Sequence, residues 1–170
     1  MEVPKTVNRD CRMAALPTCQ EVLLHDTTDE IVDIYETCRL PLGNTDCIRL
    51  LEFCSTIGTD SQRISCRLSL ASTHDPYIAL SYVWGDPTDT QEILVNERPF
   101  RVGRNLLNFL RQARIEEAND RTTRQFWVDA LCINQAVILE KNHQVGNMGK
   151  IYSNAAFVLV WLGADQEHVQ

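Results

Sequence analysis

The run FWVDALCI at residues 126–133 decides the fold of this chain. Seven of its eight residues are apolar, and such a run predicts a strand buried on both faces, as in a parallel sheet. Apolar residues then repeat at helical spacing through 137–152, and a second apolar run, AFVLVWL at 156–162, predicts another buried strand. Strand, helix and strand in this order predict a crossover. We therefore expect an α/β fold with a mostly parallel central sheet flanked by helices.

The sequence before this crossover predicts a β-rich lead-in. Short apolar-rich runs that end in polar residues or glycine are typical of strands. Such runs occupy 47–53, 64–70 and 77–84, and a hairpin is expected from 92–96 and 100–102. Between the hairpin and the crossover, leucines three and four residues apart predict a helix over 105–118.

The chain is expected to hold one folded domain behind a loose N-terminal part. Residues 1–26 show no clear period and are expected to be flexible. Thr27 and Glu30 have the spacing of a capping box, which predicts a short helical lead-in over 27–45. The folded domain is then expected to span 46–170.

Composition excludes several classes of protein. The chain has 170 residues and a formal net charge of −7, which argues against nucleic acid as a partner. Its seven cysteines form no C-x-x-C pair, so we expect reduced thiols and no metal site. The N-terminus lacks the apolar core of a secretory signal, and the longest apolar run has eight residues, too few to cross a bilayer. A soluble, cytoplasmic protein without membrane contact is expected.

Polar residues beside the apolar runs mark a candidate binding site. A carboxylate inside a buried run, such as Asp129, needs a partner, and ligands of open α/β sheets bind beyond the carboxyl ends of strands. Two readings stay open. Asp129 either ties down backbone amides or contacts a ligand, and the segment around Trp84 is either a tight turn or one wall of a crevice. The candidate ligand-binding residues are Ser81, Trp84, Gly85, Asp129, Asn134 and Gln135.

Other side chains could take part in catalysis or binding, but each also has an interpretation that needs no function. Glu140 falls early in the helix predicted over 137–152, where the helix dipole favours a carboxylate on a solvated face. Seven arginines between Arg98 and Arg124 allow a phosphate contact, although a solvated helix face is favoured. Cys132 with His143 suggests a nucleophile and base, but a cysteine in an apolar run is usually inert packing.

Three segments, in this order, resemble the HET (heterokaryon incompatibility) domain family. They are YIALSYVWGD at 77–86, FWVDALCINQ at 126–135, and the stretch from Gln144 to the VWLG at 160–163. Weaker matches at 48–51 and 105–106 extend the resemblance to roughly 46–163. It implies a fungal intracellular module that promotes programmed cell death after non-self recognition. Such a module acts through homotypic or heterotypic protein contacts or self-association, and no cofactor is required.

The resemblance also implies an enzymatic alternative. HET domains look distantly similar to TIR domains, some of which hydrolyse NAD with a glutamate on the helix after a central strand. Glu140 best fits that description, as the catalytic residue of an NAD glycohydrolase with NAD as its substrate. Two departures from the family pattern, Val137 and the end of the chain at Gln170, keep a third reading open, an inactive and truncated family member.

Overall fold

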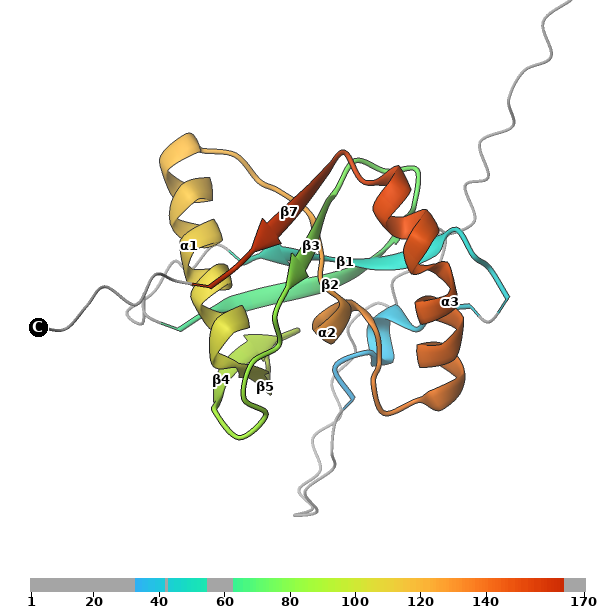
Figure 1. Cartoon of the computed structure of the whole chain (residues 1–170), viewed down its shortest axis with the longest axis horizontal. Helices are drawn as coiled ribbons and strands as arrows, with labels where there is room; N and C mark the ends of the chain where they lie inside the picture. The colour runs from blue at the N-terminus through green and yellow to red at the C-terminus, as the bar shows by residue number, and fades with distance from the viewer. Residues whose placement is uncertain (1–32, 42, 55–62, 164–170) are drawn as a thin grey trace, which may run out of the picture.

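The computed structural model describes residues 33–41, 43–54 and 63–163, which form one seven-stranded sheet with helices against it (Figure 1). The strand order is β5-β4-β2-β1-β6-β3-β7. The elements in chain order are the 3-10 helix η1 (Glu36–Cys38), β1 (Cys47–Phe53), β2 (Ser65–Ser72), β3 (Ile78–Tyr82), β4 (Thr90–Val95), β5 (Arg98–Gly103), α1 (Arg104–Asp120), β6 (Phe126–Trp127), α2 (Asp129–Cys132), α3 (Ile138–Asn154) and β7 (Phe157–Trp161).

The predicted α/β class is confirmed, and the sheet is mixed. Its β6, β3 and β7 strands are parallel neighbours, as a crossover requires, and β2 and β4 are also parallel. The β1 strand runs antiparallel to both of its neighbours, and β4 and β5 form an antiparallel hairpin. The predicted segment 1–26 and residues 27–32 of the helical lead-in lie outside the described residues. The described part of that lead-in contains the short η1.

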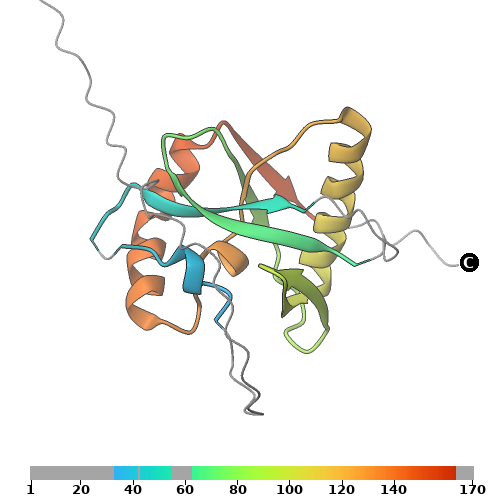
Figure 2. The same ribbon diagram turned by 180° about the vertical axis from the view of Figure 1, so that it is seen from behind.

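The two long helices cover opposite faces of the sheet. Phe126 packs edge-to-face on Phe109 of α1, with ring centroids 5.8 Å apart. Trp127, the next residue of β6, packs on Tyr152 of α3, with centroids 5.5 Å apart. Consecutive strand residues point to opposite faces, so α1 and α3 lie on the two sides. Figure 2 shows β1 and β2 running between them from behind. In the described residues no helix combines the length and hydrophobicity needed to cross a membrane.

The hydrophobicity of the run 126–133 predicts one continuous strand, and this prediction is wrong. The strand ends at Trp127, and Asp129 begins the short helix α2. An unbroken apolar run has no period that distinguishes a buried strand from a buried helical turn. The Asp129 carboxylate accepts a hydrogen bond from the Ala130 amide at 2.7 Å, and the Cys132 amide donates to the Val128 carbonyl at 2.7 Å. These local bonds favour the helical turn.

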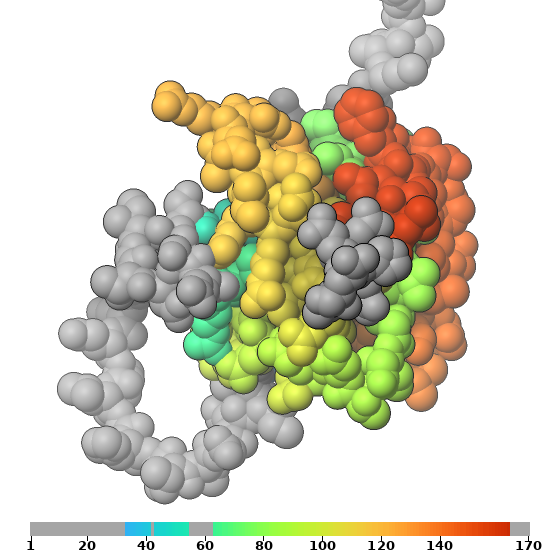
Figure 3. Space-filling model, turned by 60° about the vertical axis from the view of Figure 1, so that its left-hand side comes forward, coloured from blue at the N-terminus to red at the C-terminus, as the bar shows by residue number. Residues whose placement is uncertain are grey.

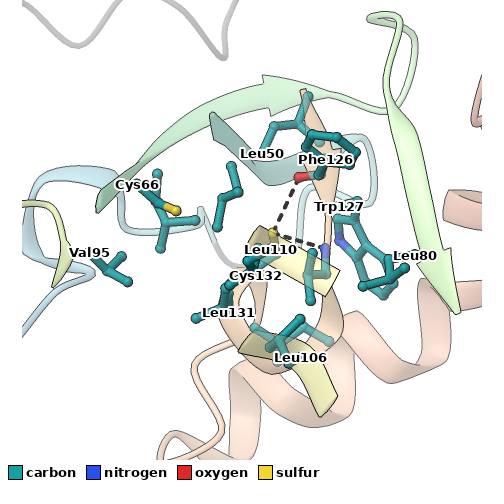
Figure 4. Packing of buried hydrophobic residues seen from close by; sticks show 14 of the residues in the cluster. Leu50, Cys66, Leu80, Val95, Leu106, Leu110, Phe126, Trp127, Leu131 and Cys132 are labelled. Atoms are coloured by element: carbon teal, nitrogen blue, oxygen red, sulfur yellow. Dashed lines mark hydrogen bonds between the residues drawn. The ribbon is translucent and has the colours of Figure 1, made fainter. Parts of the chain in front are cut away.

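The core lies where α1, α2 and the sheet meet (Figure 4). Leu106 and Leu110 of α1 pack there with Phe126 and Leu131. Cys132 is fully buried among them, and its sulfur accepts a hydrogen bond from the Val128 amide at 3.3 Å. Burial raises the pKa of this thiol to about 12, so Cys132 is packing rather than a nucleophile.

The predicted strand over 156–162 forms at 157–161, but it is not buried. The strand β7 lies at the end of the sheet and has one hydrogen-bonded neighbour, β3. Its burial pattern is mostly exposed. The predicted burial of this strand is therefore wrong. Hydrophobicity alone does not indicate whether a strand lies in the middle of a sheet or at its edge.

The hairpin predicted before α1 is confirmed and has a two-residue loop. Val95 and Arg98 are opposite partners in the ladder, so Asn96 and Glu97 form the loop. Both have a positive φ, 51° and 65°, as a type I′ turn requires. Asn96 accepts a hydrogen bond from the Leu68 amide at 2.9 Å. The turn is therefore held against β2, while Glu97 has a conformation that suits glycine better.

We expect Glu97→Gly to raise the free energy of unfolding by about 0.5–1 kcal/mol, because glycine adopts a positive φ without the steric cost of a Cβ. Chemical denaturation measures the change. The control is Arg98→Gly, whose φ is not positive, and it should lower stability by roughly the same amount. Destabilisation by both glycines would contradict this account of the turn.

Candidate functional site

Three of the predicted site residues meet where β3 and β6 end. The Trp84 indole Nε1 donates to Asp129 Oδ2 at 3.2 Å. The Gln135 side-chain Nε2 donates to the Asp129 carbonyl at 3.0 Å. The strands are parallel neighbours, so the segments that follow them leave the sheet at the same edge. Two segments that are far apart in the sequence are thereby joined through Asp129.

Both carboxylate oxygens of Asp129 accept hydrogen bonds from the protein itself. Oδ2 accepts from Trp84, and Oδ1 accepts from the Ala130 amide. Burial raises the pKa of Asp129 above its usual value, although these two donors oppose the shift. Burial and then the charge of Asp129 raise the pKa of Tyr82 as well. The reading in which Asp129 ties down backbone amides matches these contacts.

Gly85 belongs to the same turn, which is fastened to α1. Gly85 has a φ of 78°, a conformation that favours glycine. The Asn105 side chain donates to the Val83 carbonyl at 2.6 Å and accepts from the Trp161 indole at 2.9 Å. The start of α1 thus holds the turn after β3 next to β7.

Ser81 lies apart from this cluster. It is in register with Val160 of β7, two residues along from Ala79. Ala79 is itself paired with Trp127, so Ser81 shares the face of the sheet that α3 covers. Among the described residues no hydrogen bond joins Ser81 to Asp129.

Asn134 and Glu140 form a second, separate cluster around a buried arginine. Glu140 Oε1 accepts from the Asn134 amide at 2.6 Å and from Arg49 Nη1 at 2.6 Å, and Oε2 accepts from Arg49 Nη2 at 3.0 Å. The Arg49 side chain has no exposed surface, and the Glu140 side chain is 12% exposed. A carboxylate and a guanidinium that share two parallel bonds form the strong, bidentate kind of ion pair.

Arg49 joins four parts of the chain at once. Its Nε donates to the Cys38 carbonyl at 2.7 Å, and Nη1 donates to the Cys132 carbonyl at 3.0 Å. The guanidinium also lies 4.5 Å from the centre of the Tyr35 ring, in the range of a cation–π contact. Burial would lower the pKa of Arg49, whereas the bonds and charge of Glu140 raise it above its usual value. Arg49 therefore stays charged inside the protein.

In the described part of the chain, the hydrogen bonds of the predicted site residues do not join them into one cluster. They divide between the cluster at Asp129, the cluster at Arg49 and the face that carries Ser81. A cavity of about 230 Å³ lies elsewhere, near Cys66 of β2 and the Asn96 turn. In the part of the chain that the structure describes, no group of three or more His, Cys, Asp or Glu side chains is placed to hold a metal ion. The ligand-binding and catalytic roles of the site residues stay predictions.

Sequence reasoning missed Arg49, although the signal was present. Arg49 is a lone charge in the apolar run CIRLLEF at 47–53, as Asp129 is in its own run. A charge in a buried strand requires a partner. The partner, Glu140, lies 91 positions away, and no local spacing reveals such a pair.

We expect Arg49→Met or Glu140→Met alone to lower the free energy of unfolding by about 3–5 kcal/mol, because either change leaves a buried charge without its partner. The double variant should lose clearly less than the sum of the two, since it buries no charge. Urea denaturation of all four proteins measures the coupling.

The exposed pair Arg104–Asp89, with an N–O distance of 3.0 Å, is the matched control. Methionine at its positions should change stability by roughly 1 kcal/mol or less. Additive losses at Arg49 and Glu140 would contradict the buried ion pair.

Comparison with known proteins identifies the family. The sequence model of the family described as "Heterokaryon incompatibility protein (HET)" matches residues 77–170. Heterokaryon incompatibility protein 6, OR allele, from Neurospora crassa is 43% identical over 96 residues, which cover 51% of this chain and 14% of that protein. No solved structure matches. Because the family model covers more than half of the chain and includes both strands that carry the Trp84–Asp129 cluster, the chain belongs to the heterokaryon incompatibility (HET) protein family.

Proposed function

We propose that this chain is the signalling module of a heterokaryon incompatibility protein, which promotes cell death after non-self recognition and acts in the cytoplasm through contacts with other proteins. Family membership and the relative from Neurospora crassa support the heterokaryon incompatibility role. One structural observation favours a module that acts by contact. The carboxylates at the candidate site are held by the protein's own donors.

A catalytic carboxylate has to reach its substrate in order to move a proton or stabilise a charge. Asp129 has one oxygen on a backbone amide and the other on the Trp84 indole. Glu140 has both oxygens on Arg49 and is almost buried. These bonds shape the segments that follow β3 and α2. They suit a scaffold that presents a surface and requires no cofactor.

NAD hydrolysis at Glu140 is the enzymatic alternative. Cleavage of a glycosidic bond needs a carboxylate that faces the developing positive charge on the sugar. In this structure the Arg49 guanidinium donates hydrogen bonds to both oxygens of the Glu140 carboxylate. An NAD glycohydrolase that uses Glu140 would first have to open a buried ion pair, and the energetic cost of doing so weighs against it.

We expect induced expression of the chain in a filamentous fungus to kill cells while cellular NAD stays at its resting level. Killing is measured by uptake of a membrane-impermeant dye, and NAD is measured in extracts taken before the cells die. The double variant Arg49→Met/Glu140→Met removes the carboxylate and leaves no unpaired buried charge. It should still kill, because the proposed contacts do not need Glu140 as an acid.

The controls are an immunoblot for expression and circular dichroism of the purified variant for its fold. Loss of killing by a folded double variant, together with NAD depletion by the unmodified chain, would support NAD hydrolysis instead. Absence of killing by the unmodified chain would contradict the proposed function and favour an inactive family member.

A further inference from the structure

Buried polar atoms without a hydrogen-bond partner gather at the helix α3. In the part of the chain that the structure describes, they are Trp127 Nε1, His143 Nε2, Gln144 Oε1 and Asn147 Nδ2. The last three belong to α3, and the Trp127 ring packs on Tyr152 of the same helix. Buried polar groups in folded proteins are nearly always paired, and each unpaired group disfavours the arrangement that buries it. The packing of α3 therefore carries a free-energy penalty.

The three unpaired groups of α3 share one face of the helix. Asn147 lies four residues after His143 and three after Gln144, and side chains at these spacings are neighbours on a helix. Gln144 is only 1% exposed, and its Nε2 donates to the Cys47 carbonyl of β1 at 3.3 Å. Its Oε1 has no such partner among the described residues. The centre of α3 thus packs against the start of β1 through a polar side chain that is only partly paired.

Two glycines lie in the same central part of α3. Neither Gly146 nor Gly149 has a positive φ, and a Cβ added to either would meet no neighbouring atom within 4 Å. Neither the backbone conformation nor the packing in the described structure requires glycine here. Glycine in the interior of a helix favours the helical state less than alanine does, and it leaves the backbone freer to change conformation. The two glycines therefore weaken the helix where its packing is also unfavourable.

Both ends of α3 are held by hydrogen bonds to other parts of the fold. At the N-terminal end Glu140 is paired with Arg49. At the C-terminal end the Tyr152 hydroxyl donates to the Leu80 carbonyl of β3 at 3.0 Å. Between these bonds, Met148 packs against the core as a partly buried side chain. The helix consequently has a weak centre between two firmly attached ends.

We propose that residues 143–149 of α3 form a conformational switch, which opens locally while both ends of the helix stay attached. In the closed form, which the structure shows, the unpaired polar groups of this stretch are buried. In the open form they reach solvent. Gly146 and Gly149 are exposed, and Figure 3 shows the outer surface of α3, in orange, at the right-hand edge of the molecule. An outward bend of the centre therefore leads into solvent.

Opening at this place would change the relation between two parts of the molecule. At one end of α3 Glu140 holds the Asn134 amide, and the other end leads into β7. A bend in the centre would alter how these two parts lie relative to each other. Any partner that binds the open form better than the closed form would shift the population towards it. The switch is a property of this chain alone and does not rest on the proposed function.

Hydrogen exchange of the whole 170-residue chain, followed for each amide by NMR in increasing urea, tests the proposal. Amides of residues 146–149 should exchange at a rate that does not change at low urea concentration, because a local opening exposes little new surface. Amides in the centre of α1, around Leu110, should exchange only through global unfolding, which urea promotes. If both groups of amides show the same free energy of opening and the same dependence on urea, the proposal is overturned.

A pair of leucine variants tests the cause of the opening. Asn147→Leu removes the buried unpaired amide, and it should slow exchange at the centre of α3 about tenfold or more. The matched control Asn142→Leu makes the same change at an exposed position of the same helix. Its gain in helix propensity should slow exchange only about twofold. Equal slowing by the two variants would also overturn the proposal, because the unpaired amide would then have no part in the opening.

A further pair of variants tests whether the opening is local. Ala113→Gly weakens the centre of α1, so it should speed exchange of the α1 amides roughly fivefold or more and leave exchange of residues 146–149 unchanged. Gly146→Ala should slow exchange at the centre of α3 about fivefold, because the added methyl group has open space. Circular dichroism verifies the fold of each variant. Acceleration of both helices by Ala113→Gly would show that α3 opens only in global unfolding, which contradicts the switch.

Discussion

The buried guanidinium of Arg49 is the constraint that organises this structure. It donates hydrogen bonds to the Cys38 carbonyl before β1, to the Cys132 carbonyl at the end of α2 and to the Glu140 carboxylate on α3. A buried charge without its partners costs several kcal/mol, so these segments have to come together in one arrangement. Glu140 in turn holds the Asn134 amide. The segment between α2 and α3 is thus shaped by a residue from the other half of the chain.

This contact joins the family-matched part of the chain to the part before it. The family model begins at residue 77, whereas β1 lies in the middle of the sheet, between β2 and β6. Without β1 and β2 the sheet would separate into the hairpin β4–β5 and the parallel group β6–β3–β7. The hydrophobic core spans both parts as well, since Leu50 and Cys66 belong to the same buried cluster as Leu110 and Phe126 (Figure 4). The folding unit is therefore larger than the matched segment.

Patterns with a period were predictable from the sequence, and contacts between distant segments were not. The helix α1, the hairpin and the α3–β7 crossover each have a local pattern that fixes their type. The run at 126–133 has no period, and hydrophobicity does not place β7 at an edge. The proximity of Trp84, Asp129 and Gln135 was predictable because these residues follow neighbouring parallel strands. Glu140 could not be assigned to Arg49, because nothing near either residue in the sequence indicates the pair.

The most direct test of this account compares two fragments by proton–nitrogen NMR correlation spectra. The longer fragment holds residues 33–163. The shorter fragment holds residues 77–163 and therefore lacks Arg49, β1 and β2. The central strand β1 carries Arg49 and, with β2, joins the two parts of the sheet, so the longer fragment should give a dispersed spectrum with one set of sharp peaks, and the shorter fragment should give the narrow amide range of an unfolded chain. A dispersed spectrum from residues 77–163 alone would show that the family-matched segment folds without β1 and its Arg49, and would contradict the account.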